Sequence, residues 1–273
     1  MIPPSAWTDP EQMSRQDASN LAKFLEERAQ FPDQIQVNQF LVETLAPAPG
    51  EKLLEAGSGS GVLCRLVAPA VIPGGHITGL EISPNLAEVA QQYAEDTGLG
   101  DHISFEAGNA EAMPFDSESF DGAFAARLLM HSEHPDAITQ EMARVVRPGG
   151  KVVLMDWDVE TTVIDHSDKQ LTRRILNWRT DNKDRNNWSG RQLWNRAVSA
   201  GLQNLEVFPR VSITFDDNSS LGQTLWRAAK DACDKRAITQ GEYDSWVGEL
   251  QERLVMGTFF ASIVYYIVRG NRS

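Results

Sequence analysis

The sequence predicts an α/β protein with a doubly wound, mainly parallel sheet. A short apolar strand near 52–56 runs into a glycine-rich turn and then into a helix over roughly 60–70. A second strand, 76–81, ends in an acidic residue about twenty residues beyond the turn. Further strands alternate with helical stretches whose length is typical of parallel α/β sheets.

The glycine-rich turn reads G-S-G-S-G over 57–61 and follows Glu55. Glycines at alternate positions allow positive φ and let a ligand approach bare main chain. The helix after the turn offers unpaired N–H groups at its start. The spacing differs from the G-x-G-x-x-G of dinucleotide-binding turns. The turn therefore predicts a nucleotide-type pocket at the carboxyl end of the sheet.

The second strand ends at Glu81, whose carboxylate can accept hydrogen bonds from both ribose hydroxyls of an adenosine. Ser83 is expected to cap the next helix, with Pro84 in its first position. Strand three is expected at 102–107 and strand four at 119–125.

These motifs resemble the class I S-adenosylmethionine-dependent methyltransferases, and the similarity covers roughly 50–157. The loops after strands three and four, with the Arg-Pro-Gly-Gly turn at 147–150, resemble the ubiquinone/menaquinone biosynthesis C-methyltransferase-like (methyltransferase type 11) small-molecule group. The resemblance implies a Rossmann-like sheet of seven strands in the order 3-2-1-4-5-7-6, with the last strand antiparallel and with helical cap insertions. Strand five is expected at 152–156 and strand seven at 258–268, the latter after two helices near 219–235 and 240–255.

The resemblance implies S-adenosyl-L-methionine as cofactor and S-adenosyl-L-homocysteine as product. The residues expected to bind the cofactor are Glu55, Gly57, Ser58, Gly59, Glu81, Ile82, Asn109, Ala110, Glu111 and Arg127. Asn109 stands where the family typically has an aspartate that accepts from the adenine amino group. Its amide can accept through oxygen or donate to a ring nitrogen, or the residue is simply a turn former. Arg127 matches the position that lines the methionine part of the cofactor.

A sulfonium makes its methyl group a strong electrophile, so the protein mainly has to align the reactants and exclude water. His131, with an ordinary pKa near 6.5, is the best candidate base for an oxygen or carbon acceptor. Asp156 and Asp158, expected at the end of strand five, are further catalytic candidates. The alternatives are a histidine that caps a loop, two solvated acids, and an amine acceptor that needs no base.

The chain is expected to form a single methyltransferase domain over 1–273. The expected parts are an N-terminal helical cover (1–46), a cofactor-binding core (47–158), substrate cap elements with strand six (159–256) and a closing strand (257–273). Packing on the sheet edge is the alternative role for the first part. Within it, Asp33 is expected to cap a helix over 34–45.

Charge and aromatic content describe the expected partner. The formal charge of −13 argues against nucleic acid. Residues 171–236 nevertheless hold twelve Lys/Arg and seven Asp/Glu, a net of +5 that suits an anionic substrate. The tryptophans of this region either line an aromatic pocket or, for at least two of them, pack in the core: Trp178, Trp188, Trp194 and Trp226. We expect a small-molecule substrate, anionic or aromatic, and a monomer or homodimer.

Two cysteines without metal or disulfide spacing indicate a reducing compartment, and we expect a cytoplasmic protein without a metal site. No signal peptide or membrane span is expected. The function expected is methyl transfer to an O, N or C nucleophile, in biosynthesis of a quinone or secondary metabolite. A nicotinamide-dependent oxidoreductase and a non-catalytic methyltransferase-like binding protein remain alternatives. The turn spacing argues against the first, and the intact turn with Glu81 argues against the second.

Overall fold

The computed structural model describes residues 10–182 and 185–273. Its sheet has seven strands in the order β3-β2-β1-β4-β5-β7-β6, which confirms the predicted order. The strands are β1 (Lys52–Ala56), β2 (His76–Glu81), β3 (Ile103–Ala107), β4 (Phe120–Ala126), β5 (Val146–Ile164), β6 (Gln203–Thr214) and β7 (Ala261–Asn271). The helical elements are η1 (Pro10–Gln12), α2 (Arg15–Ala29), α3 (Pro32–Leu45), α4 (Val62–Val71), α5 (Pro84–Asp96), η2 (Leu129–His131), α6 (Pro135–Val145), α7 (Lys169–Asn182), α8 (Ser189–Ser199), α9 (Ser220–Asp234) and α10 (Gln240–Val255).

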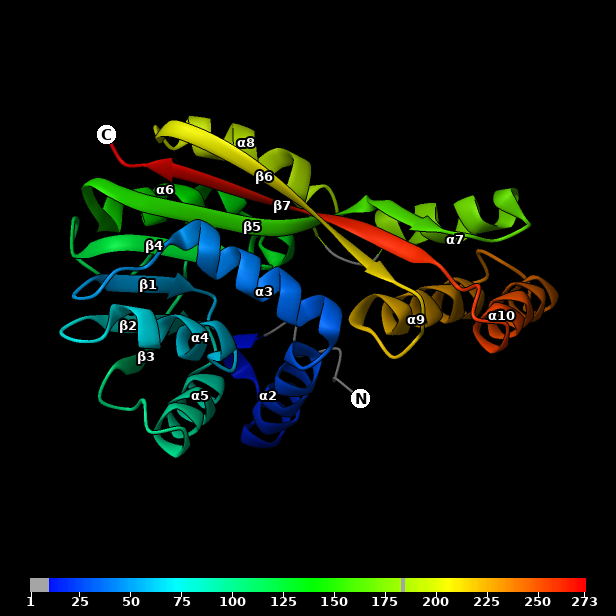
Figure 1. Ribbon diagram of the computed structural model, residues 1–273, viewed down its shortest axis with the longest axis horizontal. Helices are drawn as coiled ribbons and strands as arrows, with labels where there is room; N and C mark the ends of the chain where they lie inside the picture. The colour runs from blue at the N-terminus through cyan, green and yellow to red at the C-terminus, as the bar shows by residue number, and fades with distance from the viewer. Residues whose placement is uncertain (1–9, 183–184) are drawn as a thin grey trace.

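The sheet is parallel except at β7, which pairs antiparallel with both β5 and β6. Helices α3, α4 and α5 cover one face, and α6 and α8 cover the other (Figure 1). Each face buries its own apolar cluster, and Val67 and Met142 are fully buried members of the two. The prediction of a doubly wound α/β fold is therefore confirmed.

The cap predicted at Asp33 is wrong. Helix α3 begins at Pro32, with Phe31 in the capping position and no side-chain hydrogen bond there. Asp33 is buried, and its Oδ1 accepts a hydrogen bond of 3.4 Å from the backbone N–H of Ser220 at the start of α9. A proline can occupy the first helical position because the missing N–H has no helical partner there. The aspartate therefore serves a helix far along the chain rather than its own.

Strand β5 is much longer than the predicted 152–156, since it spans Val146–Ile164. Its parallel pairing with β4 ends at Met155, but its pairing with β7 continues to Ile164. The chain keeps an extended conformation because β7 supplies hydrogen-bond partners beyond the point at which β4 stops. Asp156 and Asp158 therefore lie inside a strand and not in a loop at its end.

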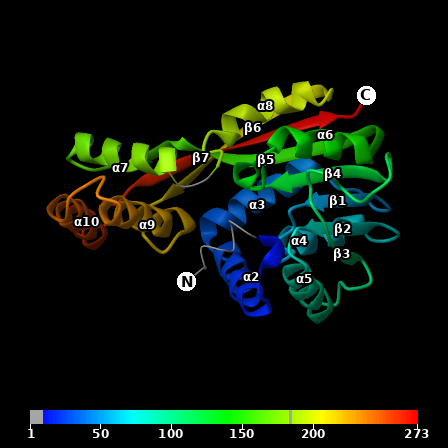
Figure 2. The same ribbon diagram turned by 180° about the vertical axis from the view of Figure 1, so that it is seen from behind.

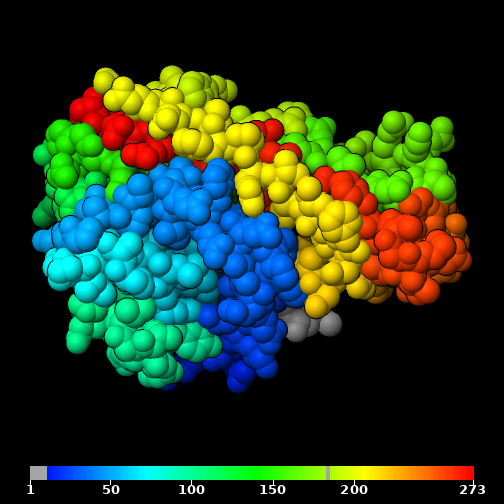
Figure 3. All heavy atoms as spheres, viewed as in Figure 1, coloured from blue at the N-terminus to red at the C-terminus, as the bar shows by residue number. Residues whose placement is uncertain are grey.

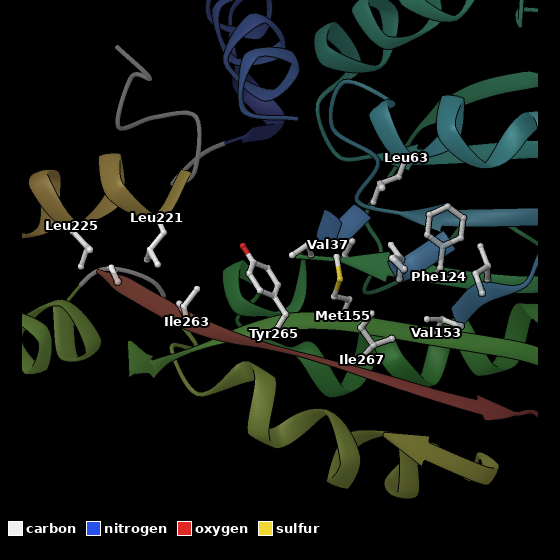
Figure 4. Packing of buried hydrophobic residues seen from close by; sticks show 14 of the residues in the cluster. Val37, Leu63, Phe124, Val153, Met155, Leu221, Leu225, Ile263, Tyr265 and Ile267 are labelled. Atoms are coloured by element: carbon white, nitrogen blue, oxygen red, sulfur yellow. The ribbon is translucent and has the colours of Figure 1, made fainter. Parts of the chain in front are cut away.

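The long strands β5, β6 and β7 extend beyond the rest of the sheet and carry α7, α9 and α10 at their far end (Figures 1 and 2). The apolar cluster continues from Leu63 and Phe124 in the nucleotide-type half to Leu221 and Leu225 in α9 (Figure 4). On the face drawn in Figure 3, β6 and α9 lie against the blue N-terminal helices. This continuity supports one domain, which we retain as a proposal. Among the described residues, no helix is long and apolar enough to cross a membrane.

Candidate active site

A cavity of about 460 Å³ opens at the carboxyl ends of β1, β2 and β4. This size lies within the roughly 300–1,000 Å³ of small-molecule sites. Its walls come from α2 and α3, the glycine turn, the loop after β3 and the segment after β4. Every residue that the sequence predicts for cofactor binding lines it, as does His131. The structure thus brings these residues together, and their roles remain predictions.

The glycine turn is fixed by hydrogen bonds to the neighbouring strand. The backbone N–H groups of Gly57 and Ser58 donate to the carbonyl of Leu80 at 2.8 and 3.0 Å. Gly57 has φ +70°, and a Cβ there would lie 2.6 Å from Leu128 Cδ1. Only glycine fits this position without moving Leu128, so the turn presents bare backbone to the cavity.

Glu81 ties the second strand to the glycine turn. Its Oε2 accepts from the N–H of Gly59 at 3.0 Å, and its Oε1 accepts from the N–H of Ser83 at 3.1 Å. Burial raises the pKa of Glu81, and the two backbone hydrogen bonds oppose that rise. A carboxylate has about four lone-pair sites. Each oxygen therefore keeps capacity to accept from a ligand hydroxyl.

Glu55 lies almost fully buried beneath the turn, at 3% exposure. The thiol of Cys64 donates to its Oε2 at 2.9 Å. Burial raises the pKa of Glu55 to about 8, against which the Cys64 hydrogen bond and the charge of Arg127 act. A cationic group in the cavity would favour the ionised form of this carboxyl.

We expect the free protein to lose stability as pH rises from 6.5 to 8. Burial raises the pKa of Glu55 to about 8 and that of Asp156 to about 7. In this window the unfolded chain has lost both protons, while the folded protein still holds part of them. The free energy of unfolding therefore falls with pH, by up to about 1.4 kcal/mol per pH unit for each group.

Thermal unfolding of the wild type, Glu55→Gln and Asp156→Asn across this pH range checks the prediction. Each variant should show a flatter decline than the wild type, because it lacks one of the two titrating carboxyls. A wild-type curve parallel to both variant curves would contradict the assignment.

The loop after β3 is shaped by Asn109. Its Oδ1 accepts from the backbone N–H of Glu111 at 2.8 Å, so the residue is a turn former. Glu111 Oε1 in turn accepts from Ser132 Oγ at 2.7 Å, which links this loop to the segment after β4. The amide nitrogen of Asn109 is left to donate to a ring nitrogen, one of the two alternatives expected from the sequence.

Arg127 follows β4 in a left-handed conformation, with φ +58°. This conformation costs a residue with a Cβ roughly 1–2 kcal/mol. The backbone N–H of Arg127 donates to the carbonyl of Met155 at 2.7 Å, which holds this conformation. The side chain is held by Nη1, which donates to Asn38 Oδ1 at 3.1 Å. The buried Nε has no hydrogen-bond partner among the described residues. The chain therefore aims a guanidinium at the cavity with donor capacity unused.

His131 ends the short helix η2 and lines the cavity. Its backbone N–H donates to the carbonyl of Leu128 at 2.9 Å. His134 also lines the cavity and occupies the capping position of α6. Of the three catalytic candidates, only His131 lies at the cavity.

The structure places Asp156 and Asp158 away from the cavity and completely buried. Both face α8: Asp156 Oδ2 accepts from Ser189 Oγ at 2.7 Å, and Asp158 pairs with Arg191 through both of its oxygens. The structure therefore supports neither the expected pocket-facing position at the end of strand five nor the alternative of solvated acids. The physical reason is the continued pairing of β5 with β7, which turns alternate side chains toward α8.

Ion pairs with acidic side chains neutralise part of the basic region predicted over 171–236. Arginines of 171–236 pair locally, as Arg174 does with Glu242 and Arg196 with Asp136, and Arg185 at the cavity pairs with Glu133. The four tryptophans named above do not line the cavity either. Trp188 and Trp194 are about half exposed, whereas Trp178 and Trp226 pack against the core. The core alternative therefore holds for two of them.

Sequence reasoning missed the cavity residues supplied by the N-terminal helices. Arg28 from α2 and Gln34 and Asn38 from α3 line the cavity. The spacing of Leu21, Leu25 and Arg28 puts them on one face of α2, a pattern that could have drawn attention to the arginine. No group of three or more His, Cys, Asp or Glu side chains in the described part of the chain can hold a metal ion.

A family described as "Methyltransferase domain" matches residues 54–154, the segment that builds the glycine turn, Glu81 and the loops around the cavity. The chain carries a methyltransferase domain. This match confirms the family predicted from the sequence.

Relatives match different parts of the chain. An "Uncharacterized 37.1 kDa protein in transposon TN4556" of Streptomyces fradiae is 30% identical over 84% of this chain and 64% of its own length. The ubiquinone/menaquinone biosynthesis C-methyltransferase UbiE of Hahella chejuensis is 31% identical over 46% of this chain and 51% of its own. The chain thus spans less than two thirds of these curated relatives.

A solved structure shares its fold with nearly the whole length of this chain. It is a phosphoethanolamine N-methyltransferase of Haemonchus contortus with phosphomonomethylethanolamine and S-adenosylhomocysteine. Its TM-score is 0.60 at 16% identity, over 97% of this chain and 59% of that chain. At this identity the likeness bears on the fold alone.

Proposed function

We propose that the protein transfers the methyl group of S-adenosylmethionine to a small-molecule acceptor. One observation carries this proposal: the carboxylate of Glu81 and the backbone of Gly59 meet at 3.0 Å on the wall of a cavity that the family-matched segment builds. The family match supports the same cofactor.

The cavity residues fit this cofactor in chemistry and position. Glu81 would hold the ribose hydroxyls, and Asn109 with the backbone of Ala110 would frame the adenine. The backbone at Gly57 would approach the methionine part, while the buried carboxyl of Glu55 would oppose its positive charge. When bound, the cofactor supplies an electrophilic methyl group on a sulfonium. The chain's own task is to orient the acceptor and exclude water.

We propose an O, N or C nucleophile on a quinone or secondary metabolite as the acceptor. The relative named for ubiquinone/menaquinone biosynthesis supports the quinone. The helices before 46 would cover the cofactor, and elements of 159–256 would cap the acceptor. We place the protein in the cytoplasm, because its two free cysteines suit a reducing compartment. We further propose that it is a monomer or a homodimer.

Incubation with S-adenosylmethionine and a panel of phenols, quinols, amines and carboxylates tests the proposal. Mass spectrometry would follow S-adenosylhomocysteine and a product heavier by one methylene unit. We expect both to appear together with at least one acceptor class. Binding of the cofactor without turnover on any class would favour the non-catalytic alternative.

His131→Asn is expected to lower kcat about a hundredfold with an acceptor that must lose a proton, the lower end of the usual range for a general base. The affinity for S-adenosylhomocysteine should stay within twofold, because the proposed role of His131 is to take a proton from the acceptor and not to bind the cofactor. Turnover with the acceptor found in the screen and calorimetry check the two parts. His102, which is half-buried and lies outside the cavity, is changed to Asn as the matched control. An unchanged kcat in His131→Asn would remove the base role.

A further inference from the structure

Of the three arginines that line the cavity, Arg185 pairs with Glu133, whereas Arg28 and Arg127 lack the carboxylate partners that arginines of this protein usually have. Among the described residues, neither forms an ion pair, although Arg65, Arg144 and Arg253 all do. Arg127 also keeps a buried Nε without a hydrogen-bond partner. Cations partly withdrawn from water are normally paired, so two half-buried guanidinium groups without carboxylate partners favour an anionic ligand.

The surroundings of Arg28 strengthen this point. Burial and the charge of Arg127 lower the pKa of Arg28 to about 9, and the charge of Arg227 lowers it further. Asp33 and the Tyr265 hydroxyl act in the opposite direction. Asp33 is already engaged, because its oxygens accept from Ser220 and from Gln34. An anionic ligand beside Arg28 would offset both its burial and its repulsion from Arg127.

Neutral donors complete the same corner of the cavity. Gln34 and Asn38, one helical turn apart on α3, are 2% exposed and line it. Gln34 Nε2 donates to the Tyr265 hydroxyl at 3.1 Å. Figure 4 shows the Tyr265 side chain rising from the sheet on the side of Val37 and Leu221. The corner therefore offers guanidinium groups from α2 and the segment after β4, together with the amide nitrogen of Asn38, while Tyr265 and Asp33 hold Gln34 in place.

This corner of the cavity faces the part of the molecule that α7, α9 and α10 form, and not the end of the cavity where the adenosine would lie. Arg28 and Arg227 of α9 approach the same Phe24 ring, with guanidinium carbons 5.9 and 5.7 Å from its centroid. Glu81, by contrast, stands at the end of β2 on the other side of the glycine turn. An acceptor approaching from the side of α9 would therefore meet Arg28 first.

We propose that Arg28 and Arg127 form a subsite that binds a carboxylate or phosphate group of the methyl acceptor. The planar guanidinium matches both anions in geometry, since it can donate two parallel hydrogen bonds. This inference rests on the proposed methyl transfer and adds the acceptor's chemical class. The carboxylate of the cofactor itself is the other source of the same chemistry, and the experiment separates the two.

Calorimetry with the full chain tests the subsite. Protein saturated with S-adenosylhomocysteine is titrated with inorganic pyrophosphate and with benzoate, for the wild type, Arg28→Gln and Arg15→Gln. Arg15 lies on the same helix with a side chain 77% exposed, so it is the matched control. We expect saturable binding of at least one anion, weakened tenfold or more by Arg28→Gln and unchanged by Arg15→Gln. Affinity for S-adenosylhomocysteine should stay within twofold in Arg28→Gln.

Three results would overturn the inference. In the first, Arg28→Gln weakens binding of S-adenosylhomocysteine tenfold, while 5′-methylthioadenosine, which lacks the carboxylate, binds as before. The corner would then bind the carboxylate of the cofactor. In the second, the wild type saturated with S-adenosylhomocysteine binds neither anion. In the third, Arg28→Gln binds both anions with wild-type affinity. Failure of the wild type to bind S-adenosylhomocysteine at all would instead overturn the proposed function, and the subsite with it.

Discussion

Glu81→Ala is expected to weaken binding of S-adenosylhomocysteine at least tenfold, about 1.4 kcal/mol or more. The substitution removes the acceptors that would hold the ribose hydroxyls. It also removes the partner of the Gly59 N–H at 3.0 Å and thereby loosens the glycine turn on which the methionine part would lie. Both effects act on the same ligand, so this is the largest change in affinity that we expect from one side chain.

Isothermal titration calorimetry measures this effect, with Glu252→Ala as the matched control on an exposed position of α10. Thermal unfolding of each variant shows whether the fold is intact. A folded Glu81→Ala protein with wild-type affinity would mean that Glu81 does not contact the cofactor.

Trp246→Ala is expected to lower the free energy of unfolding by about 3–5 kcal/mol. Trp246 is the largest fully buried side chain among the described residues. It belongs to α10 and contacts α7 and α9. Its Nε1 donates to Thr172 Oγ1 at 3.1 Å, its ring stacks on His166 with centroids 5.7 Å apart, and Trp226 meets it edge-on. The substitution would leave a cavity between α7, α9 and α10, while the Thr172 hydroxyl would keep its hydrogen bond to the carbonyl of Asp168.

Trp194→Ala is the matched control, because this side chain is 42% exposed on α8 and should cost less than about 0.5 kcal/mol. Denaturant unfolding monitored by circular dichroism compares the two variants. Equal losses would contradict the view that α7, α9 and α10 share the main core.

The cofactor half of the molecule could be predicted from the sequence because its signals are local. The turn after Lys52–Ala56, the acid at Glu81 and the cap at Ser83 each depend on a few neighbouring residues. Parallel strands then bring these short motifs to one edge of the sheet. The strand order followed from the family resemblance, and the observed sheet confirms it.

The remainder depended on contacts between segments far apart in the chain. β5 runs past Asp156 because β7, about a hundred residues later, pairs with it, so no local pattern marks where it ends. Asp33 likewise contacts Ser220. Arg28 contributes to the cavity only because α2 folds back over the glycine turn, and the regional charge excess did not reveal it. Charge counted along the chain cannot show which arginines are paired in space.

Calorimetric titration of the wild-type protein with S-adenosylmethionine and S-adenosylhomocysteine, beside NAD and NADP, tests the central claim most directly. We predict micromolar binding of both sulfur nucleotides and no binding of either nicotinamide cofactor. Binding of NAD or NADP without binding of the sulfur nucleotides would contradict the account and point to the oxidoreductase alternative.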